Sequence, residues 1–569
     1  MTTSFLKNIK YFPLIGLILI PMLCLSSLSD QYTHVKWIAF YFVAFFSSIF
    51  TLINRERILL PRLGKISYIF LLVIVFYVLS ALLNQGNYEN QLLDWLTFFT
   101  TTLLAYNLFI NENIFPEFFF QLNLLALLLI STYGFLQYFG IQLFSALAIN
   151  EFPSSFFGFQ NMSAEFVGSS LILQTVYFFY CQSSWSRLRK NIHILLLLIA
   201  HLYLFFLSSR TAFASVIVAN SILFIFFYNQ RWKFLTIIST ALVLLMFPAL
   251  HYKPQKSIFN QQTQKSLSIE SNPLKSGFNF SIEKTQISAL KKENINIRFR
   301  RWRNTLELFK KNWLFGIGPG NYEFGYIPFQ SSVFQDPEST ENSIVRSPHN
   351  GYLEALAENG LFFTLSLAVL VGWMLLKLFF TLPHTRNQSI CKTLAAALLV
   401  YILTTAFTAF PLENAYPFYL TALSVGFLLS LICKEYWIFS NFKKIILFSL
   451  FTLGIGILGA FFTLSKFNEN NFSRDKTRVN FACNFFPSNW KACSSKATLE
   501  LEKGKLVEAE RTVKKILAKS PNNFVAIRLL SLALLKQSKW HEACIALKIY
   551  DDLFYSESSL HLYYLHNCK

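Results

Sequence analysis

The chain has 569 residues, of which 54% are hydrophobic and 14% charged, with a mean hydropathy of +0.42. A soluble protein of this size could not bury so much apolar surface, so the composition excludes an ordinary soluble fold and indicates a membrane protein. The formal net charge of +20 therefore indicates Lys and Arg in cytoplasmic loops and near anionic membrane lipids, and we predict no nucleic-acid partner.

About thirteen apolar segments are long enough to cross a hydrocarbon core as helices. The first follows Lys7 and Lys10 and shows no small-residue cleavage site, so we interpret it as an uncleaved span. The sequence thus predicts an all-α polytopic membrane protein, with spans in 1–250 and again in 351–464. The segments are 11–29, 36–53, 66–84, 93–111, 115–140, 164–184, 191–208, 211–228, 233–250, 355–380, 389–410, 415–433 and 443–464.

Basic residues in short loops orient these spans, because Lys and Arg are retained on the cytoplasmic side. Four loops carry such residues, and all four fall on one side when the spans are counted from a cytoplasmic N-terminus. The loops 141–163 and 251–350, the turn 208–211 and the tail after 464 then lie outside the cytoplasm. The basic residues are Arg55, Arg57, Arg62 and Lys65; Arg187, Arg189 and Lys190; Arg231 and Lys233; and Lys434, Lys443 and Lys444.

The segment 251–350 is a candidate catalytic loop. It contains about a hundred residues of low hydropathy between two spans, which is too long for a passive connector. Its second half begins with a predicted amphipathic helix near 296–311. The sequence Gly316-Ile317-Gly318-Pro319-Gly320-Asn321-Tyr322 follows and predicts a turn, since glycine adopts backbone angles that other residues resist.

The tail 465–569 contains an internal repeat of period 34, in which Pro487 and Asn489 align with Pro521 and Asn523. This period resembles tetratricopeptide repeats, which are stacked helix hairpins, and a plain helical bundle is the alternative. Cys483 and Cys493 lie at the start of the tail, where oxidation is possible, but the sequence does not show whether they pair. The eight cysteines show no close spacing typical of a metal site.

The strongest chemical signal is His349-Asn350-Gly351-Tyr352-Leu353-Glu354, where the outer loop joins the tenth span. Helical spacing places Asn350, Leu353 and Glu354 along one side, with His349 at or just before the first turn. Polar groups at this depth are costly unless they pair or line a wet cavity. A lone histidine at a helix start is more often a cap, so this stretch alone leaves structural and catalytic roles open.

This stretch resembles the His-Asn-x-x-Leu-Glu signature of the O-antigen ligase superfamily, which includes O-antigen ligases, O-antigen polymerases and bacterial protein O-oligosaccharyltransferases. Further elements resemble family segments in the same order, and together they cover about 150–435. They are Gly158-Phe159-Gln160-Asn161-Met162-Ser163-Ala164, Ser208-Ser209-Arg210-Thr211, Arg298 four residues before Trp302 with the glycine turn after it, and more weakly Glu413-Asn414-Ala415-Tyr416-Pro417.

The resemblance implies a bacterial inner-membrane glycosyltransferase that needs no metal and no cofactor. Its donor would be a glycan on undecaprenyl pyrophosphate, and its periplasmic acceptor either lipid A core, a growing glycan chain, or Ser or Thr of a protein. A pyrophosphate leaving group needs fixed cations, for which the motif positions indicate Arg298 and Arg210. His349 would act as general base or position a substrate.

The predicted substrate-binding residues are Arg301, Asn350, Glu354, Asn161 and Tyr416. Glu354 either orients His349 or a neighbouring arginine, or pairs helices. Two alternatives belong to other functional classes: a transporter or flippase for lipid-linked sugars, which would be expected to carry charged residues deep within several spans, and a membrane-anchored scaffold whose active part is the repeat domain.

Overall fold

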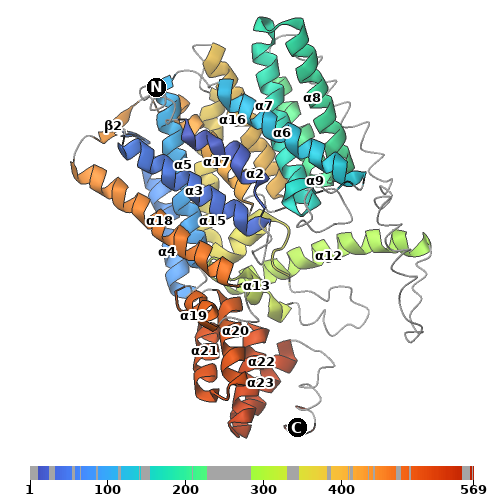
Figure 1. Cartoon of the computed structure of the whole chain (residues 1–569), viewed down its shortest axis with the longest axis vertical. Coiled ribbons are helices and arrows are strands. Elements are labelled where there is room, and N and C mark those ends of the chain that lie inside the picture. Colours follow the sequence, from blue (N-terminus) through green and yellow to red (C-terminus); the bar gives the residue numbers. More distant parts are fainter. Residues whose placement is uncertain are drawn as a thin grey trace.

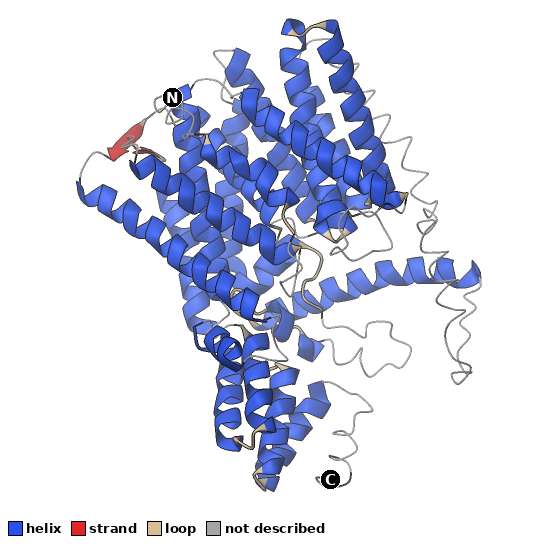
Figure 2. Ribbon diagram, viewed as in Figure 1, coloured by secondary structure: helices blue, strands red, loops and turns tan. Residues whose placement is uncertain are grey.

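The computed structural model is almost entirely helical in the residues that it describes, as Figure 2 shows, so the predicted all-α fold is confirmed. The predicted span 233–250 and most of the loop 251–350 lie outside these residues. The structure describes residues 11–24, 32–53, 58–64, 66–84, 88–112, 117–139, 141, 154–207, 209–226, 284–329, 345–380, 386–407, 409, 414–433, 435–439, 442–469, 476–485, 489–553, 564, 566 and 568.

A bundle of apolar helices forms the larger part of the molecule (Figure 1). Large side chains from both halves of the sequence, such as Phe40, Phe166 and Tyr419, share one core. The first half contributes η1 (Phe12–Ile15), α2 (Gly16–Met22), α3 (Thr33–Ile53), α4 (Ile66–Asn84), α5 (Tyr88–Glu112), α6 (Glu117–Tyr138), η2 (Ser155–Phe157), α7 (Gln160–Cys181), η3 (Gln182–Ser184), α8 (Arg187–Phe206) and α9 (Arg210–Phe226). The second half contributes α15 (Gly351–Phe380), α16 (Arg386–Ala406), α17 (Ala415–Ile432) and α18 (Phe442–Glu469).

Eight of the described helices are long and apolar enough to cross a membrane, fewer than the thirteen predicted spans. These eight are in α3, α4, α5, α6, α8, α15, α17 and α18. The predicted first span is instead a short apolar helix, Phe12–Met22, with Pro21 inside it, and the apolar part of α16 is also short, Lys392–Ala406. The helices α7 and α9 occupy two further predicted spans but are not among the eight.

Two basic loops that are far apart in sequence meet at one end of the bundle. The strands β1 (Ile58–Pro61) and β2 (Tyr436–Phe439) pair antiparallel, and Arg62 beside them forms a 2.8 Å ion pair with Glu435. The α7–α8 connection lies at the same end, whereas the α8–α9 turn, α12 (Lys284–Lys311) and the C-terminal helices lie at the other end (Figure 1). This arrangement agrees with the predicted separation of basic loops from outward segments.

Polar side chains inside the bundle bond to one another. The side-chain amide of Asn123 donates to Ser170 Oγ at 2.9 Å and to the Tyr416 hydroxyl at 3.0 Å. The amide of Asn414 donates to the buried carboxylate of Glu165 at 2.7 Å. Because an unpaired polar group is costly in an apolar interior, these bonds account for polar residues in α6, α7 and α17 as packing contacts.

The C-terminal helices form two successive hairpins. α20 (Trp490–Glu502) and α22 (Phe524–Lys536) begin 34 residues apart, and so do α21 (Leu506–Lys519) and α23 (Trp540–Leu553). Both α20 and α22 are capped by an asparagine, Asn489 or Asn523, whose side chain accepts a backbone N–H. The period of 34 therefore corresponds to a helix hairpin, while the likeness to tetratricopeptide repeats stays a prediction.

Two disulfides lie in this domain. Cys483–Cys493 joins α19 (Lys476–Phe485) to α20, which settles the pairing that the sequence had left open. Cys544–Cys568 ties α23 to the last residues of the chain, and the sequence analysis did not predict it.

The C-terminal domain packs directly on the membrane part. The side-chain amide of Asn489 donates to Ser465 Oγ in α18 at 2.9 Å. The ring of Trp490 meets that of Phe324, in α13 (Tyr322–Gly325), edge to face with centroids 5.4 Å apart. The domain therefore contacts the loop that carries the glycine turn.

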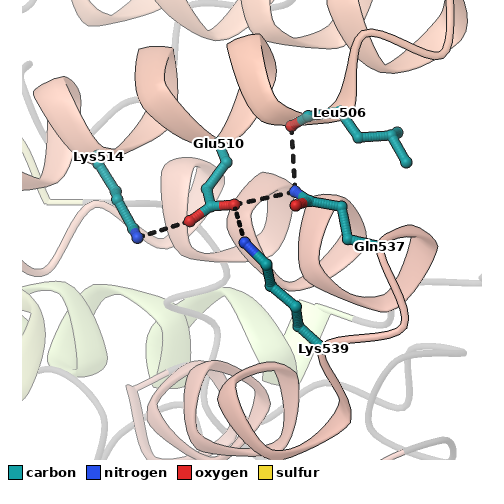
Figure 3. Close-up of polar contacts among 5 residues, drawn as sticks. All are labelled: Leu506, Glu510, Lys514, Gln537 and Lys539. Atoms are coloured by element: carbon teal, nitrogen blue, oxygen red, sulfur yellow. Dashed lines mark hydrogen bonds and ion pairs between the residues drawn. The ribbon is translucent and has the colours of Figure 1, made fainter.

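A buried carboxylate joins the two hairpins. Glu510 in α21 accepts from Lys514 Nζ at 2.6 Å, and from Lys539 Nζ and Gln537 Nε2 at 2.9 Å each, while Gln537 also donates to the Leu506 carbonyl (Figure 3). The hydrogen bonds from Lys514 and Lys539 lower the pKa of Glu510 to about 2. This carboxylate therefore stabilises the fold above its ordinary pKa, and the stabilisation is lost as the pH falls toward 2.

We expect Glu510→Gln to destabilise the hairpin pair by about 1–2 kcal/mol at neutral pH, because charged hydrogen bonds between α21, α22 and α23 are lost. Hydrogen exchange of α21–α23 in the full-length protein measures this loss. Glu508→Gln, an exposed carboxylate in the same helix, is the matched control and should leave exchange unchanged. The wild-type protein should lose protection between pH 4.5 and 2, and an equal pH response in Glu510→Gln would contradict the assignment.

Candidate active site

The start of α15 holds His349 in the predicted place, just before the first turn. The helix begins at Gly351, and the Asn350 side chain accepts the backbone N–H groups of Tyr352 and Leu353, each at 3.1 Å. An asparagine that bonds the first free N–H groups is a favoured helix cap. Asn350, predicted to bind substrate, thus has a structural contact that fixes the backbone next to His349.

The backbone of His349 adopts a left-handed conformation, with φ of 54°, which is uncommon outside glycine. The His349 N–H donates to Ser347 Oγ at 3.2 Å, and Ser347 Oγ donates to the Glu354 carboxylate at 3.3 Å. The indole N–H of Trp302 donates to the Pro348 carbonyl at 3.0 Å. These contacts hold the chain around His349, and Glu354 acts on it through Ser347.

The glycine turn, residues 316–321, packs against α15. The N–H groups of Ile317 and Gly318 donate to the carbonyls of Ala357 and Glu358 at 3.0 and 2.9 Å. A Cβ atom on Gly316 would lie 2.2 Å from the Glu358 carbonyl oxygen, closer than any real contact. This position requires glycine because two backbones meet there.

Two tyrosines that follow the turn position α12. The Tyr322 hydroxyl lies 2.7 Å from Thr305 Oγ1 in α12, and the Asn304 amide donates to the Tyr326 hydroxyl at 3.3 Å. Tyr322 and Tyr326 stack with ring centroids 5.3 Å apart. Together with the bond from Trp302 to Pro348, these contacts place α12 across the start of α15.

Three arginines and His349 come together at this crossing. Burial and the nearby guanidinium groups of Arg301 and Arg210 lower the pKa of Arg298, which nevertheless stays charged at neutral pH. Arg210 is the first residue of α9, and Arg298 and Arg301 lie on α12. A cation at a helix N-terminus is disfavoured by the helix dipole, so the fold places Arg210 against its local preference.

His349 is neutral in this environment. Burial first, and then the charges of Arg301 and Arg298, together lower its pKa to about 4. At neutral pH the ring therefore has a nitrogen lone pair with which to accept a proton. Within the described parts of the chain, no three His, Cys, Asp or Glu side chains gather as metal ligands.

The structure thus brings four predicted residues together: His349, Arg298, Arg210 and Arg301. Asn350 and Glu354 stand beside them with the hydrogen bonds described above. Ser208, from the Ser-Arg-Thr element, lies outside the described residues.

The other two predicted substrate-binding residues belong to α7 and α17. Asn161 is exposed on the first turn of α7. Tyr416 is 1% exposed in the bundle, bonded to Asn123 and packed against the Phe166 ring at 4.7 Å. The surroundings of Tyr416 favour a packing role over substrate contact, and the substrate contacts of both residues stay predictions.

Sequence reasoning did not give Ser347 and Trp302 the roles that they have here. Ser347 stands two residues before His349, a spacing at which a hydroxyl can accept a backbone N–H, and this local signal could have identified it. Trp302 was recognised only as part of a motif. Its bond to Pro348 spans 46 residues, which no local pattern predicts.

Comparison with known proteins agrees with this geometry. Residues 194–368 match the family model described as O-Antigen ligase, a segment that runs from α8 through α9, α12 and α13 into α15. It therefore contains Arg210, Arg298, Arg301 and His349. A search of curated proteins finds no match. Residues 194–368 of the chain are thus similar to the O-antigen ligase family, and this segment carries the four residues brought together at the site.

Proposed function

We propose that the protein transfers a glycan from undecaprenyl pyrophosphate to an acceptor outside the cytoplasm. The observation that carries the proposal is that Arg298 and Arg301 lie near His349, with Arg210 near Arg298, at one end of the bundle. Guanidinium groups stay protonated and match phosphate oxygens with paired N–H donors. Such a cluster suits a donor whose sugar is attached to pyrophosphate.

The proposed step breaks one bond and forms another at the anomeric carbon of the donor sugar. The acceptor hydroxyl oxygen attacks this carbon, with inversion, and the bond from the carbon to the pyrophosphate oxygen breaks. The arginines stabilise the negative charge that develops on the departing pyrophosphate. His349 accepts the proton of the acceptor hydroxyl.

The site faces the periplasm of the bacterial inner membrane in this proposal. Both disulfides belong to the C-terminal domain, which lies at the same end of the bundle as α12 (Figure 1). Disulfides persist in oxidising compartments and are rare in the cytoplasm. The basic loops, which favour the cytoplasmic side, lie at the opposite end.

The proposed acceptor is lipid A core, which is the acceptor in O-antigen ligases, with Ser or Thr of a protein as the second candidate. The observation that favours a protein is the helical-hairpin domain docked on the glycine-turn loop through Trp490 and Phe324, since helical repeats offer peptide-binding surfaces. A transporter is less favoured, because charged side chains buried in the bundle bond within the protein: Glu165 accepts from Asn414, and Lys36 donates to the Leu23 and Phe156 carbonyls.

A deletion strain tests the function and separates the acceptors. It should accumulate polyprenyl-linked glycan and lose glycan either from lipopolysaccharide or from proteins stained for carbohydrate. Loss from lipopolysaccharide alone assigns lipid A core, and loss from protein alone assigns Ser or Thr. Unchanged glycans on both would overturn the proposed function.

We expect the pH dependence of transfer to show how the arginine charges around His349 lower its pKa. The acid limb of kcat/KM should lie near pH 4, because His349 must be neutral to accept a proton. Arg301→Gln removes a cation that lowers the pKa of His349, so its acid limb should move toward pH 6.5. Arg303→Gln, an exposed position on the same helix, should leave the limb in place, and equal limbs in all three proteins would exclude His349 as the titrating group.

A further inference from the structure

The carboxyl group of Glu358 lies inside the glycine turn. Glu358 is 5% exposed, and its Oε1 accepts the backbone N–H of Tyr322 at 3.0 Å. The backbone N–H groups of Gly320 and Asn321 lie near this carboxylate, and the Asn321 N–H donates to the Gly318 carbonyl at 3.3 Å. Gln91 Nε2, from α5, donates to the other oxygen, Oε2, at 3.1 Å.

A glycine-rich turn with converging N–H groups is a common phosphate-binding element in proteins. Here a side chain of the protein itself occupies that position. Since the Tyr322 N–H is bonded to Glu358 and the Asn321 N–H to the Gly318 carbonyl, the turn does not offer these groups to a pyrophosphate. The binding of an anionic donor is then left to the arginine cluster.

The same carboxylate connects the turn to α12 through a short series of bonds. Glu358 holds the Tyr322 backbone, and the Tyr322 hydroxyl meets Thr305 Oγ1 at 2.7 Å. Thr305 Oγ1 also lies 2.7 Å from the Arg301 carbonyl, to which it donates. Glu358 lies nine residues after His349 in the same segment of chain. It therefore connects the segment that carries His349 to the helix that carries Arg301.

Residues from two other helices support this connection. Ser80 Oγ, in α4, donates to the Phe315 carbonyl at 2.6 Å and contacts the Glu358 carbonyl at 3.2 Å. A buried carboxylate is costly unless its oxygens receive hydrogen bonds, and Glu358 receives them from α5 and from the turn. These contacts hold the turn against the start of α15.

We propose that Glu358 is a positioning residue that binds the glycine turn as an internal anion and so holds the arginines of α12 against His349. This inference rests on the proposed function for its catalytic consequence. It assigns no contact between Glu358 and substrate.

The test compares Glu358→Gln with Glu307→Gln in the full-length protein in lipid nanodiscs. Glu307 is an exposed α12 carboxylate whose partner is Lys310, so its variant is the matched control. Hydrogen exchange over 313–322 should become about tenfold faster in Glu358→Gln and stay unchanged in Glu307→Gln, because the charged hydrogen bonds to the turn weaken.

Transfer by the same preparations measures the consequence for the site. In Glu358→Gln we expect turnover to fall by about tenfold or more, the donor KM to rise, and the acid limb of kcat/KM to move upward as the arginines shift away from His349. Tyr322→Phe, which keeps the carboxylate and removes the bond to Thr305, should move the acid limb in the same direction. This second variant tests the linkage if Glu358→Gln does not fold.

Unchanged exchange over 313–322 in Glu358→Gln would overturn the proposal. Faster exchange with wild-type turnover and an unmoved acid limb would also overturn it, because the turn would then be held for stability alone. Absence of transfer by the wild-type protein would instead refute the proposed function, and the exchange measurement would still decide whether Glu358 holds the turn.

Discussion

Replacing His349 with Ala is expected to lower turnover by on the order of 10²-fold or more, the usual range for a lost general base. The ring lies where Arg298 and Arg301 converge, and its lowered pKa keeps it neutral at physiological pH. Membrane insertion should be intact, because the cap of α15 is made by Asn350. Turnover by purified protein, normalised to the folded fraction, measures the effect.

The left-handed backbone at His349 provides the control. Asparagine tolerates this conformation better than alanine but supplies no base, so His349→Asn should be as inactive as His349→Ala with less loss of stability. Ser347→Ala removes the bonds to the His349 N–H and to the Glu354 carboxylate but leaves the ring in place, so it should retain most activity. Near-wild-type turnover in His349→Asn would remove this residue from the mechanism.

Loss of Arg298 or Arg210 should reduce turnover by about 10²–10³-fold, equivalent to roughly 3–4 kcal/mol of transition-state stabilisation. Both guanidinium groups lie at the proposed position of the leaving pyrophosphate, where negative charge develops. Arg303→Ala should have little effect, because Arg303 lies on another face of α12 and is not among the charges that act on Arg298 or His349. The measurement is single-turnover transfer from a saturating polyprenyl-linked donor.

Two controls separate charge stabilisation from other roles. Arg298→Lys keeps a positive charge but loses the paired N–H donors, so it should fall between Arg298→Ala and the wild type. Transfer should survive EDTA if the arginines carry the charge. Loss of transfer on chelation with recovery by a divalent cation, or equal effects of the Arg298, Arg210 and Arg303 substitutions, would argue against this assignment.

The parts of the site that follow from local sequence could be predicted. The spacing of Asn350, Leu353 and Glu354 predicted a helix with His349 at or just before its first turn, and the spaced glycines after 315 predicted the turn, because both signals depend on a few nearby residues. The basic residues of the short loops indicated which ends of the helices lie on the same side. The pairing of β1 with β2, which brings two of these loops together, agrees with this prediction.

Contacts between distant segments could not be predicted in this way. The amide of Gln91 meets Glu358 across 267 residues, and nothing near either residue signals the pairing. Tyr416 was predicted to bind substrate from a resemblance to a family segment, and its burial beside Asn123, a residue 293 positions away, could not be predicted from its neighbours in the sequence either. Eight of the described helices are long and apolar enough to cross a membrane, while the predicted spans at Phe12–Met22 and Lys392–Ala406 are short apolar helices and 233–250 lies outside the described residues.

The most direct test of the account uses the purified protein in liposomes with a defined polyprenyl-pyrophosphate-linked glycan and lipid A core. The wild type should release one polyprenyl pyrophosphate for each glycan that becomes attached to the acceptor, and His349→Asn should release almost none. Acceptor peptides rich in Ser and Thr replace lipid A core in a parallel reaction. Movement of the intact donor across the bilayer without release of polyprenyl pyrophosphate, or equal release by the wild type and His349→Asn, would contradict the account.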